Sequence, residues 1–372
     1  MLVCAPSMTL AQMDPTDLTP VAPTGLAMLG DDFPALLAHV RPAIEARLTE
    51  LWTTKIASIH RHGPAVVAMA SAARELTLRG GKRFRAALLA AVHGGVAPEA
   101  ALDPAFQIGV ALELLQTYLL IQDDWMDGDA SRRGGPSVHV ILGAELGERF
   151  GAASAILASD FTWGIAVATI AAIEAPPARV VEVMQLFLRI HEDVVVGQQI
   201  DLLGRAEDVE AMHDLKTGSY TVRGPIALGA ALAGASPSAR AALDRYAAPL
   251  GVAFQLRDDL LGTFGSPEET GKLIGSDLRT GKRTAILAEA EHRLDAAGRE
   301  TLARAFNRAD ATDAEVAAAT EVLQACGARG EVERRLASLC DDAEALAADL
   351  PLAPAAKQML AGAARSLRKG PE

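Results

Sequence analysis

Hydrophobic residues recur at intervals of three and four along most of the chain, the spacing of helices that bury one face. Clusters of glycine and proline interrupt this pattern near residues 80–81, 134–136, 176–177, 234–237 and 262–281. Between these breaks the pattern predicts helices over residues 33–56, 64–78, 84–94, 104–127, 138–173, 179–203, 210–233 and 239–261, and again from 284 towards the end.

The composition supports an all-α fold. Hydrophobic residues make up 50% of the 372 residues but aromatic residues only 4%, and strands are usually richer in aromatic and β-branched side chains. No serine- or glycine-rich linker and no long block of charge divides residues 31–350, so the sequence predicts one large domain there. We expect a flexible N-terminal extension over 1–30 and a C-terminal tail over 351–372.

The net charge, the cysteines and the N-terminal residues indicate which kinds of ligand and which cellular location to expect. The net charge of -12 opposes binding to nucleic acid and to anionic lipid headgroups. The three cysteines, Cys4, Cys326 and Cys340, have neither metal-ligand spacing nor the arrangement of a disulfide framework. The first residues lack the basic and apolar regions of a secretory signal. These features predict a cytoplasmic protein that does not bind nucleic acid.

The longest apolar stretch, residues 151–173, approaches the length of a membrane span. Asp160 lies in its middle, where a charge is costly in hydrocarbon. We therefore expect a buried helix and no stable membrane insertion.

Two segments place adjacent aspartates at the C-terminal end of an apolar helix. They read Gln-Asp-Asp-Trp-Met-Asp over 122–127 and Gln-Leu-Arg-Asp-Asp-Leu-Leu over 255–261. Asp123 and Asp127 are four positions apart, so their carboxylates share one helix face at about 6 Å. Oxygen ligands of this kind suit magnesium, which takes further ligands from substrate phosphates. The alternative is that each pair is merely a solvated helix end.

Basic clusters lie close to both acidic segments. Arg132-Arg133 follows the first pair, a Gly-Gly-Lys-Arg-Phe-Arg segment covers 80–85, and lysines at 272 and 282 follow the second pair. Arginine forks bind phosphate oxygens, and a helix that begins at 84 adds backbone amides. Basic clusters beside acidic helices in an acidic protein indicate a polyanion bridged by metal ions, and diphosphate is the natural candidate.

These segments together resemble the trans-isoprenyl diphosphate synthase (polyprenyl synthetase) family. The 80–85 segment is similar to its isopentenyl diphosphate motif, and 123–127 with 132–134 to its first aspartate-rich motif. Lys216-Thr217, Gln198 with Asp201, residues 254–259 and 271–282 are similar to the other signature positions, so the resemblance covers about 31–350. It implies the terpenoid synthase fold, a large helical bundle around a central cavity, and a homodimer.

The resemblance also implies roles for individual residues. Metal ligands would be Asp123, Asp127 and Asp258, for about three Mg²⁺ ions, with Asp124 and Asp259 in support. Isopentenyl diphosphate would be held by Lys82, Arg85, Gln116 and Arg133. The allylic diphosphate (dimethylallyl, geranyl or farnesyl) would be held by Arg132, Lys216, Lys272 and Lys282, and Thr217 and Gln255 would face the cationic centre.

The chain departs from the family pattern at two positions. Gly262 stands where the second motif often has its last aspartate, and Gln122 stands where many members have histidine before the first motif. Neither position belongs to the predicted set of metal ligands. The departures could alter rate or length preference.

Residues before the first motif bear on product length. Tyr118 lies five positions before Asp123, with Leu119 and Leu115 as smaller neighbours. This arrangement resembles synthases that make C15 to C20 products, and we expect geranylgeranyl diphosphate ahead of farnesyl diphosphate. Tyr118 could instead be an ordinary core aromatic.

Two other functions remain as alternatives. A class I terpene cyclase shares the first aspartate-rich motif, but it would normally lack the site formed by Lys82 and Arg85. A non-catalytic regulatory subunit of a prenyl synthase would be expected to lose metal carboxylates, whereas both aspartate pairs are present.

Overall fold

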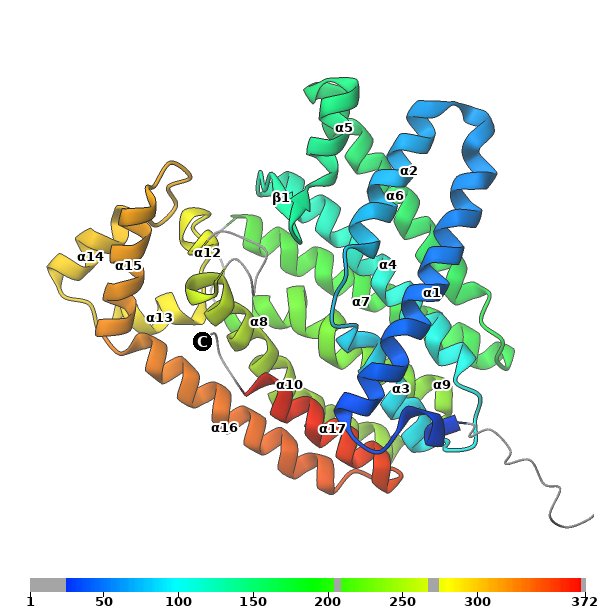
Figure 1. The fold of residues 1–372 in the computed structure, drawn as a ribbon. Coiled ribbons are helices and arrows are strands. Elements are labelled where there is room, and N and C mark those ends of the chain that lie inside the picture. Colours follow the sequence, from blue (N-terminus) through cyan, green and yellow to red (C-terminus); the bar gives the residue numbers. More distant parts are fainter. Residues whose placement is uncertain (1–24, 204–208, 267–273, 369–372) are drawn as a thin grey trace, which may run out of the picture.

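The computed structural model describes residues 25–203, 209–266 and 274–368, and these are almost entirely helical (Figure 1). The N-terminal half contains the 3₁₀ helices η2 (Gly25–Leu29) and η3 (His60–His62), the helices α1 (Phe33–Ile59), α2 (Pro64–Leu78), α3 (Phe84–Val96), α4 (Asp103–Met126), α5 (Val138–Leu146), α6 (Glu148–Ala171) and α7 (Pro177–Leu203), and the short strands β1 (Ser131–Arg132) and β2 (Gly135–Pro136).

The C-terminal half continues the helical pattern. Its elements are α8 (Val209–His213), the π-helix η4 (Asp214–Arg223), α9 (Gly224–Ala233), α10 (Pro237–Phe264), α12 (Ser276–Arg279), α13 (Ala285–Glu291), α14 (Ala296–Ala303), α15 (Asp313–Ala325), α16 (Ala328–Ala348) and α17 (Pro354–Leu367). The predicted all-α class is confirmed.

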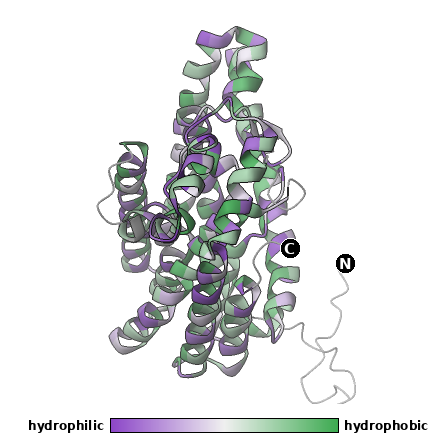
Figure 2. Ribbon diagram, turned by 90° about the vertical axis from the view of Figure 1, so that its left-hand side faces the viewer, coloured by the Kyte–Doolittle hydropathy of each residue, from purple (hydrophilic) through white to green (hydrophobic). Residues whose placement is uncertain are grey.

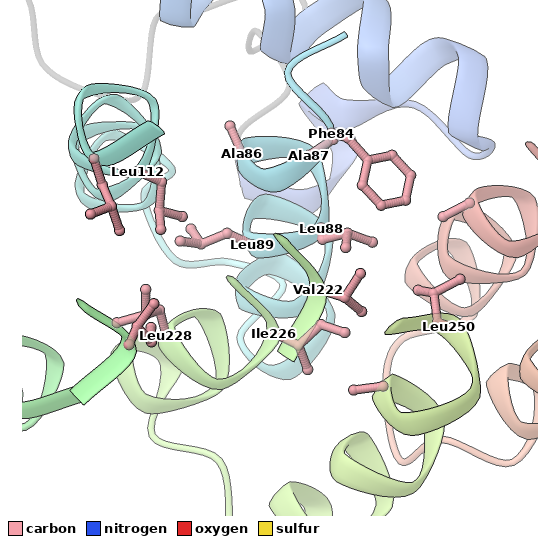
Figure 3. Close-up of a cluster of buried hydrophobic side chains, with 14 of the residues drawn as sticks. Phe84, Ala86, Ala87, Leu88, Leu89, Leu112, Val222, Ile226, Leu228 and Leu250 are labelled. Atoms are coloured by element: carbon pink, nitrogen blue, oxygen red, sulfur yellow. The ribbon is translucent and has the colours of Figure 1, made fainter. Parts of the chain in front are cut away.

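Helix α3 lies at the centre of the bundle. Its residues from Phe84 to Gly95 are all buried, and apart from Arg85 and His93 they are apolar or glycine on every side of the helix. Helices α1, α4, α9 and α17 pack around it. Figure 3 shows Leu88 and Leu89 of α3 among Leu112 of α4 and Ile226 of α9. In Figure 2 most other helices carry both hydrophobic and hydrophilic residues along their length, as expected of helices that bury one face.

The single helix predicted over 138–173 is two helices. Gly147 has φ +88°, a conformation that favours glycine, and it ends α5 and begins α6. The two helices then pack closely, since a Cβ on Gly151 would lie 2.4 Å from the Cα of Gly143. The pattern of apolar residues continues through the turn, so periodicity alone did not reveal it. The predicted helix 210–233 is also divided, but without a turn: α8, the π-helix η4 and α9 follow one another directly, and only the hydrogen-bond pattern changes.

The expected chain ends differ from the structure where they can be compared. Residues 354–367, placed in the predicted tail, form α17, whose buried residues include Met359, Leu360 and Leu367. Helix α17 packs on α3 and α16, so it is part of the helical core. At the N-terminus, Leu26 and Leu29 are buried and the Leu26 amide donates to the Pro98 carbonyl. Residues 1–24 and 369–372 lie outside the described residues.

Two helices of the described chain are long and apolar enough to cross a membrane, α4 and α6. In α4, 72% of the 18-residue apolar stretch is buried inside the protein, compared with 39% of the corresponding stretch in α6. Helix α4 is therefore a core helix. Much of α6, including the exposed Asp160, lies at the surface.

Candidate active site

The first aspartate-rich segment lies at the C-terminal end of α4, and the β1–β2 ribbon returns the chain to it. Arg132 Nε donates to Asp124 Oδ1 at 2.6 Å. Arg132 Nη2 also lies 3.2 Å from Asp123 Oδ2 and 3.2 Å from Asp129 Oδ2. One guanidinium thus bridges three carboxylates and orients the end of the helix.

Two lysines reach the same carboxylates from distant parts of the chain. Lys216 Nζ on η4 lies 2.5 Å from Asp201 Oδ2 and 3.3 Å from Asp123 Oδ1. Lys282 Nζ, beyond α12, lies 3.3 Å from Asp127 Oδ2. Residues more than ninety positions apart therefore converge on one acidic centre.

The π-helical form of η4 helps place Lys216. Helix α7 passes so close that a Cβ on Gly197 would lie 2.5 Å from the Lys216 backbone nitrogen. π-Helical turns are rare and occur frequently at functional sites. Glycine at 197 is what permits this approach.

The electrostatics of the centre are dominated by negative charge. Burial raises the pKa of Asp127, and the neighbouring Asp123 carboxylate raises it further, although Lys282 and Lys216 oppose the shift. The two carboxylates of this helix face repel each other despite the nearby lysines. Such a pair is stabilised by additional positive charge.

The second aspartate pair lies near the C-terminal end of α10. Asp259 is buried and accepts hydrogen bonds from Gln255 Nε2 at 2.6 Å and from the Ala285 amide at 2.8 Å. Burial raises the pKa of Asp259 to about 8. Asp258 is exposed, so it is the member of the pair that can reach a ligand.

A separate cationic centre surrounds the N-terminus of α3. Arg85 Nη1 donates to Gln116 Oε1 at 2.7 Å, and Nη2 donates to Thr221 Oγ1 at 2.8 Å. The Arg85 guanidinium also stacks 4.3 Å from the centre of the Tyr220 ring. These contacts fix its fork in one orientation.

Arg133 and Lys82 complete this centre. Arg133 Nη1 donates to the Gly80 carbonyl at 2.9 Å, while Lys82, two residues later in the chain than Gly80, is exposed. Burial lowers the pKa of Arg133, as do the neighbouring guanidiniums of Arg83 and Arg85, although Glu113 opposes the shift. An excess of positive charge at a helix N-terminus is suited to an anion.

Two adjoining cavities connect charged and apolar surfaces. One, of about 740 Å³, is lined by the ends of α4 and α7 and by the segment after α12, including Asp127, Asp201 and Lys282. The other, of about 180 Å³, is largely apolar and is lined by residues such as Leu119, Val195 and Thr217. Met126 and Leu202 line both. A ligand with a charged head and an apolar tail would match this arrangement.

Comparison with known proteins decides between the possible families. A family model described as polyprenyl synthetase matches residues 67–323. The chain belongs to the polyprenyl synthetase family. It is a prenyltransferase, a trans-isoprenyl diphosphate synthase, as the resemblance of its motifs implied.

Relatives of this synthase include enzymes of different product length. The geranylgeranyl diphosphate synthase of Methanosarcina mazei is 32% identical over 281 residues, which cover 73% of this chain and 80% of that protein. The farnesyl diphosphate synthase of Geobacillus stearothermophilus is 34% identical over 217 residues, covering 55% of this chain and 69% of that protein. These relatives leave the product length open.

A solved structure shares the fold throughout. The geranylgeranyl pyrophosphate synthase of Corynebacterium glutamicum, crystallised with isoprenyl diphosphate and magnesium, superposes with a TM-score of 0.85. It is 29% identical, and the match covers 90% of this chain and 99% of that one. The predicted terpenoid synthase fold is thereby confirmed.

The donor set of the synthase fits a hard divalent cation. Asp123, Asp127 and Asp258 offer only carboxylate oxygens, and the charge repulsion at Asp127 would be relieved by a bound cation. Within the residues that the structure describes, no three such side chains already surround one point. A magnesium ion here would therefore take its remaining ligands from substrate oxygens and water.

Sequence reasoning missed an ion pair beneath the cationic centre. Arg83 Nη1 donates to Glu113 Oε2 at 2.5 Å, and both side chains are only 1% and 3% exposed. Arg83 has φ +51° and also donates to the Thr77 carbonyl. The signal available was a lone glutamate in an otherwise apolar stretch of α4. Thr221, Tyr220 and Asp129 were also missed.

Three further residues predicted to bind substrate, Gln255, Thr217 and Lys272, differ in their surroundings. Gln255 donates to Asp259 and lines a different cavity, with His213 and His292, whereas Thr217 lines the apolar cavity of the site. Lys272 lies outside the described residues. Gln122, the second departure from the family pattern, donates to Ser159 Oγ at 3.2 Å.

The residues predicted to set product length occupy different depths. Leu119 lines the apolar cavity, while Leu115 is fully buried in the core. Tyr118 is 7% exposed, and its hydroxyl lies 3.1 Å from His191 Nε2. Its ring packs 5.6 Å from that of Trp163, which stacks on His191 at 4.0 Å.

Proposed function

We propose that this prenyl diphosphate synthase joins isopentenyl diphosphate head-to-tail to an allylic diphosphate, with Mg²⁺ as its cofactor and geranylgeranyl diphosphate as its main product. The observation that carries the proposal is the meeting of three parts: Asp123 and Lys216 of the acidic centre line the apolar cavity, and so does Tyr220, whose ring contacts Arg85 of the cationic centre. The acidic centre matches the diphosphate of the allylic substrate, the cationic centre matches isopentenyl diphosphate, and the apolar cavity matches the hydrocarbon tail.

The acidic centre is the proposed allylic diphosphate site. Asp123, Asp127 and Asp258 would hold about three Mg²⁺ ions, which supply charge neutralisation of the departing diphosphate. Lys216, Lys282 and Arg132 lie beside these carboxylates and provide further positive charge for diphosphate oxygens.

The cationic centre is the proposed isopentenyl diphosphate site. Arg85 is held by Gln116, Thr221 and Tyr220, so its free edge has a fixed direction. Thr217 and the apolar walls would surround the allylic cation and exclude water that would otherwise quench it. The double bond of isopentenyl diphosphate then attacks the allylic cation that remains once the bond to the diphosphate has broken. The condensed product loses a proton to the departing diphosphate.

Incubation of purified protein with labelled isopentenyl diphosphate, Mg²⁺ and each allylic primer tests the function. We expect products that accumulate at C20, with C15 as the shorter intermediate, and no product when the metal is chelated. A terpene cyclase would instead consume the allylic diphosphate alone and release a hydrocarbon. A regulatory subunit would form no product by itself. Either result would reject the proposal.

Tyr118 is proposed to close the end of the apolar cavity. The cavity-lining residues Gln122 on α4 and Val195 on α7 each lie one turn beyond Tyr118 and His191. The stacked cluster of Tyr118, Trp163 and His191 therefore lies just past the cavity walls.

Replacing Tyr118 with alanine is expected to lengthen the main product by at least one isoprene unit, because the ring no longer blocks the growing tail. Products are sized by chromatography after dephosphorylation. Tyr118→Phe is the matched control, since it keeps the ring and should leave the length unchanged. Identical products from Tyr118→Ala and the parent would remove Tyr118 from this role.

A second copy of the chain is the proposed partner of an apolar stripe on α7. Val181 and Leu188 are seven positions apart and 55% and 38% exposed. Val195 and Leu202 continue the same spacing towards the end of the helix, where they also line the active-site cavities. Residues at this spacing lie along one side of a helix. The neighbouring α6, which packs against α7, also exposes the apolar side chains of Ile156 and Leu157.

Replacing Leu188 with glutamate is expected to weaken a homodimer about a hundredfold or more, because it places a charge in the middle of the buried face. Sedimentation velocity at micromolar concentration should show a dimeric parent and a monomeric variant. Met28→Glu, at an exposed residue on η2, should remain dimeric. A parent that sediments as a monomer would contradict the proposed dimer.

A further inference from the structure

Position 262 on α10 would normally continue the acidic face of that helix. It lies four residues after Asp258, so a side chain there would stand beside the Asp258 carboxylate. Asp123 and Asp127 at the end of α4 are also four residues apart, so their carboxylates lie beside each other in this way. Gly262 has no side chain, and α10 alone therefore lacks the second carboxylate of such a pair.

The carboxylate of Asp277 occupies the space beside Gly262. A Cβ on Gly262 would lie 2.0 Å from Asp277 Oδ2, 2.5 Å from its Cγ and 3.0 Å from Oδ1. These separations are shorter than any van der Waals contact, so the carboxylate lies where the side chain of residue 262 would begin. Asp277 reaches this place from α12, which packs against α10 (Figure 1).

Asp277 is also tied to Lys282 of the acidic centre. The Lys282 amide donates to the Asp277 carbonyl at 2.9 Å, which closes the turn that leads to the lysine. Burial lowers the pKa of Lys282, but Asp277, Asp123 and Asp127 raise it by more. Lys282 Nζ lies 3.3 Å from Asp127 Oδ2 on α4, so the turn that Asp277 closes is the one that presents this lysine to the α4 aspartates.

We propose that Asp277 supplies the carboxylate that α10 lacks at Gly262, and that the two positions act as one unit in holding Mg²⁺–diphosphate. The inference rests on the proposed metal-dependent function of this site. Asp277 is a positioning residue: its carboxylate extends the Asp258 face by one turn and holds Lys282 towards the diphosphate.

The proposed pairing of Gly262 with Asp277 explains why glycine stands in the last turn of α10. Glycine weakens a helix relative to alanine, so its presence here calls for a reason. Any larger residue at 262 would displace the Asp277 carboxylate, and with it the support for Lys282. The departure of this chain from the family motif is thus compensated by a residue from a neighbouring element.

Calorimetric titration of the full chain with pyrophosphate in the presence of Mg²⁺ tests the proposal without turnover. Asp277→Asn is expected to weaken binding about tenfold or more, in the range seen when residues that orient metal ligands are removed. Gly262→Ala, which leaves Asp277 in the sequence but fills its place, is expected to weaken binding similarly. Circular dichroism checks that both variants remain helical.

Exchanging the residues at positions 262 and 277 distinguishes the effect of the carboxylate charge on binding from the effect of its packing. The double variant Gly262→Asp with Asp277→Gly should bind within about threefold of the parent, because it restores a carboxylate beside Asp258. The matched variant Gly262→Asn with Asp277→Gly has nearly the same shape without the charge, and should stay as weak as Asp277→Asn.

Two results would overturn the inference alone: parent-like binding by Asp277→Asn and Gly262→Ala, or equal recovery by the asparagine and aspartate exchanges. If the exchanged proteins do not fold, the two single variants still decide the matter. A parent protein that fails to bind Mg²⁺–pyrophosphate would instead reject the proposed function itself.

Discussion

Replacing Asp123 with asparagine is expected to lower kcat/KM at least about a thousandfold with little change in the helical signal. The variant keeps the size of the side chain but removes a charge that faces Lys216 and Arg132 and is proposed to bind metal. Loss of a metal-held contact to the leaving group costs several kcal/mol of transition-state stabilisation, and each 1.36 kcal/mol is about tenfold in rate.

The measurement is initial rate of product formation with both substrates varied. Asp244→Asn, at an exposed position on the same helix as Asp258, is the control and should retain parent activity. An Asp123→Asn enzyme within tenfold of the parent would contradict the assigned metal role.

The largest loss of stability is expected from Glu113→Ala. Removing this carboxylate leaves the Arg83 guanidinium buried and without its principal partner, which typically costs about 3 to 5 kcal/mol. Urea unfolding followed by circular dichroism should show the corresponding fall in midpoint. The KM for isopentenyl diphosphate should also rise, because Arg83 lies between Lys82 and Arg85 of that site.

A double variant serves as the control for this ion pair. Arg83→Met with Glu113→Leu removes both charges and fills similar volume, so it should recover most of the lost stability. If Glu113→Ala unfolds at the same urea concentration as the parent, the pair does not anchor the segment that carries Lys82 and Arg85.

The sequence was most informative where chemistry and periodicity coincide. Asp123 and Asp258 stand near the ends of the long helices α4 and α10, and Asp127 caps the C-terminus of α4. The element that carries each aspartate, and the shared face of Asp123 and Asp127, were therefore predictable. The spatial meeting of Lys216 and Lys282 with the α4 aspartates was inferred from the family motifs. The distances between these charges support that inference.

The remaining features depend on contacts that no local pattern encodes. The ion pair of Arg83 with Glu113 joins two elements, and the cluster around Tyr118 joins α4, α6 and α7. The turn at Gly147 and the core packing of α17 were missed because apolar spacing does not say which helix a face will meet. Likewise, Asp277 is distant from Gly262 in sequence and adjacent only in the folded chain.

The π-helix η4 serves both halves of the site. Lys216, near its start, contacts Asp123, whereas Thr221 and Tyr220, near its end, hold Arg85. A shift of this one segment on occupation of either diphosphate position would move ligands of the other. Thermodynamic linkage then requires reciprocity, so the first substrate to arrive would change the affinity for the second by the same factor in either order of addition.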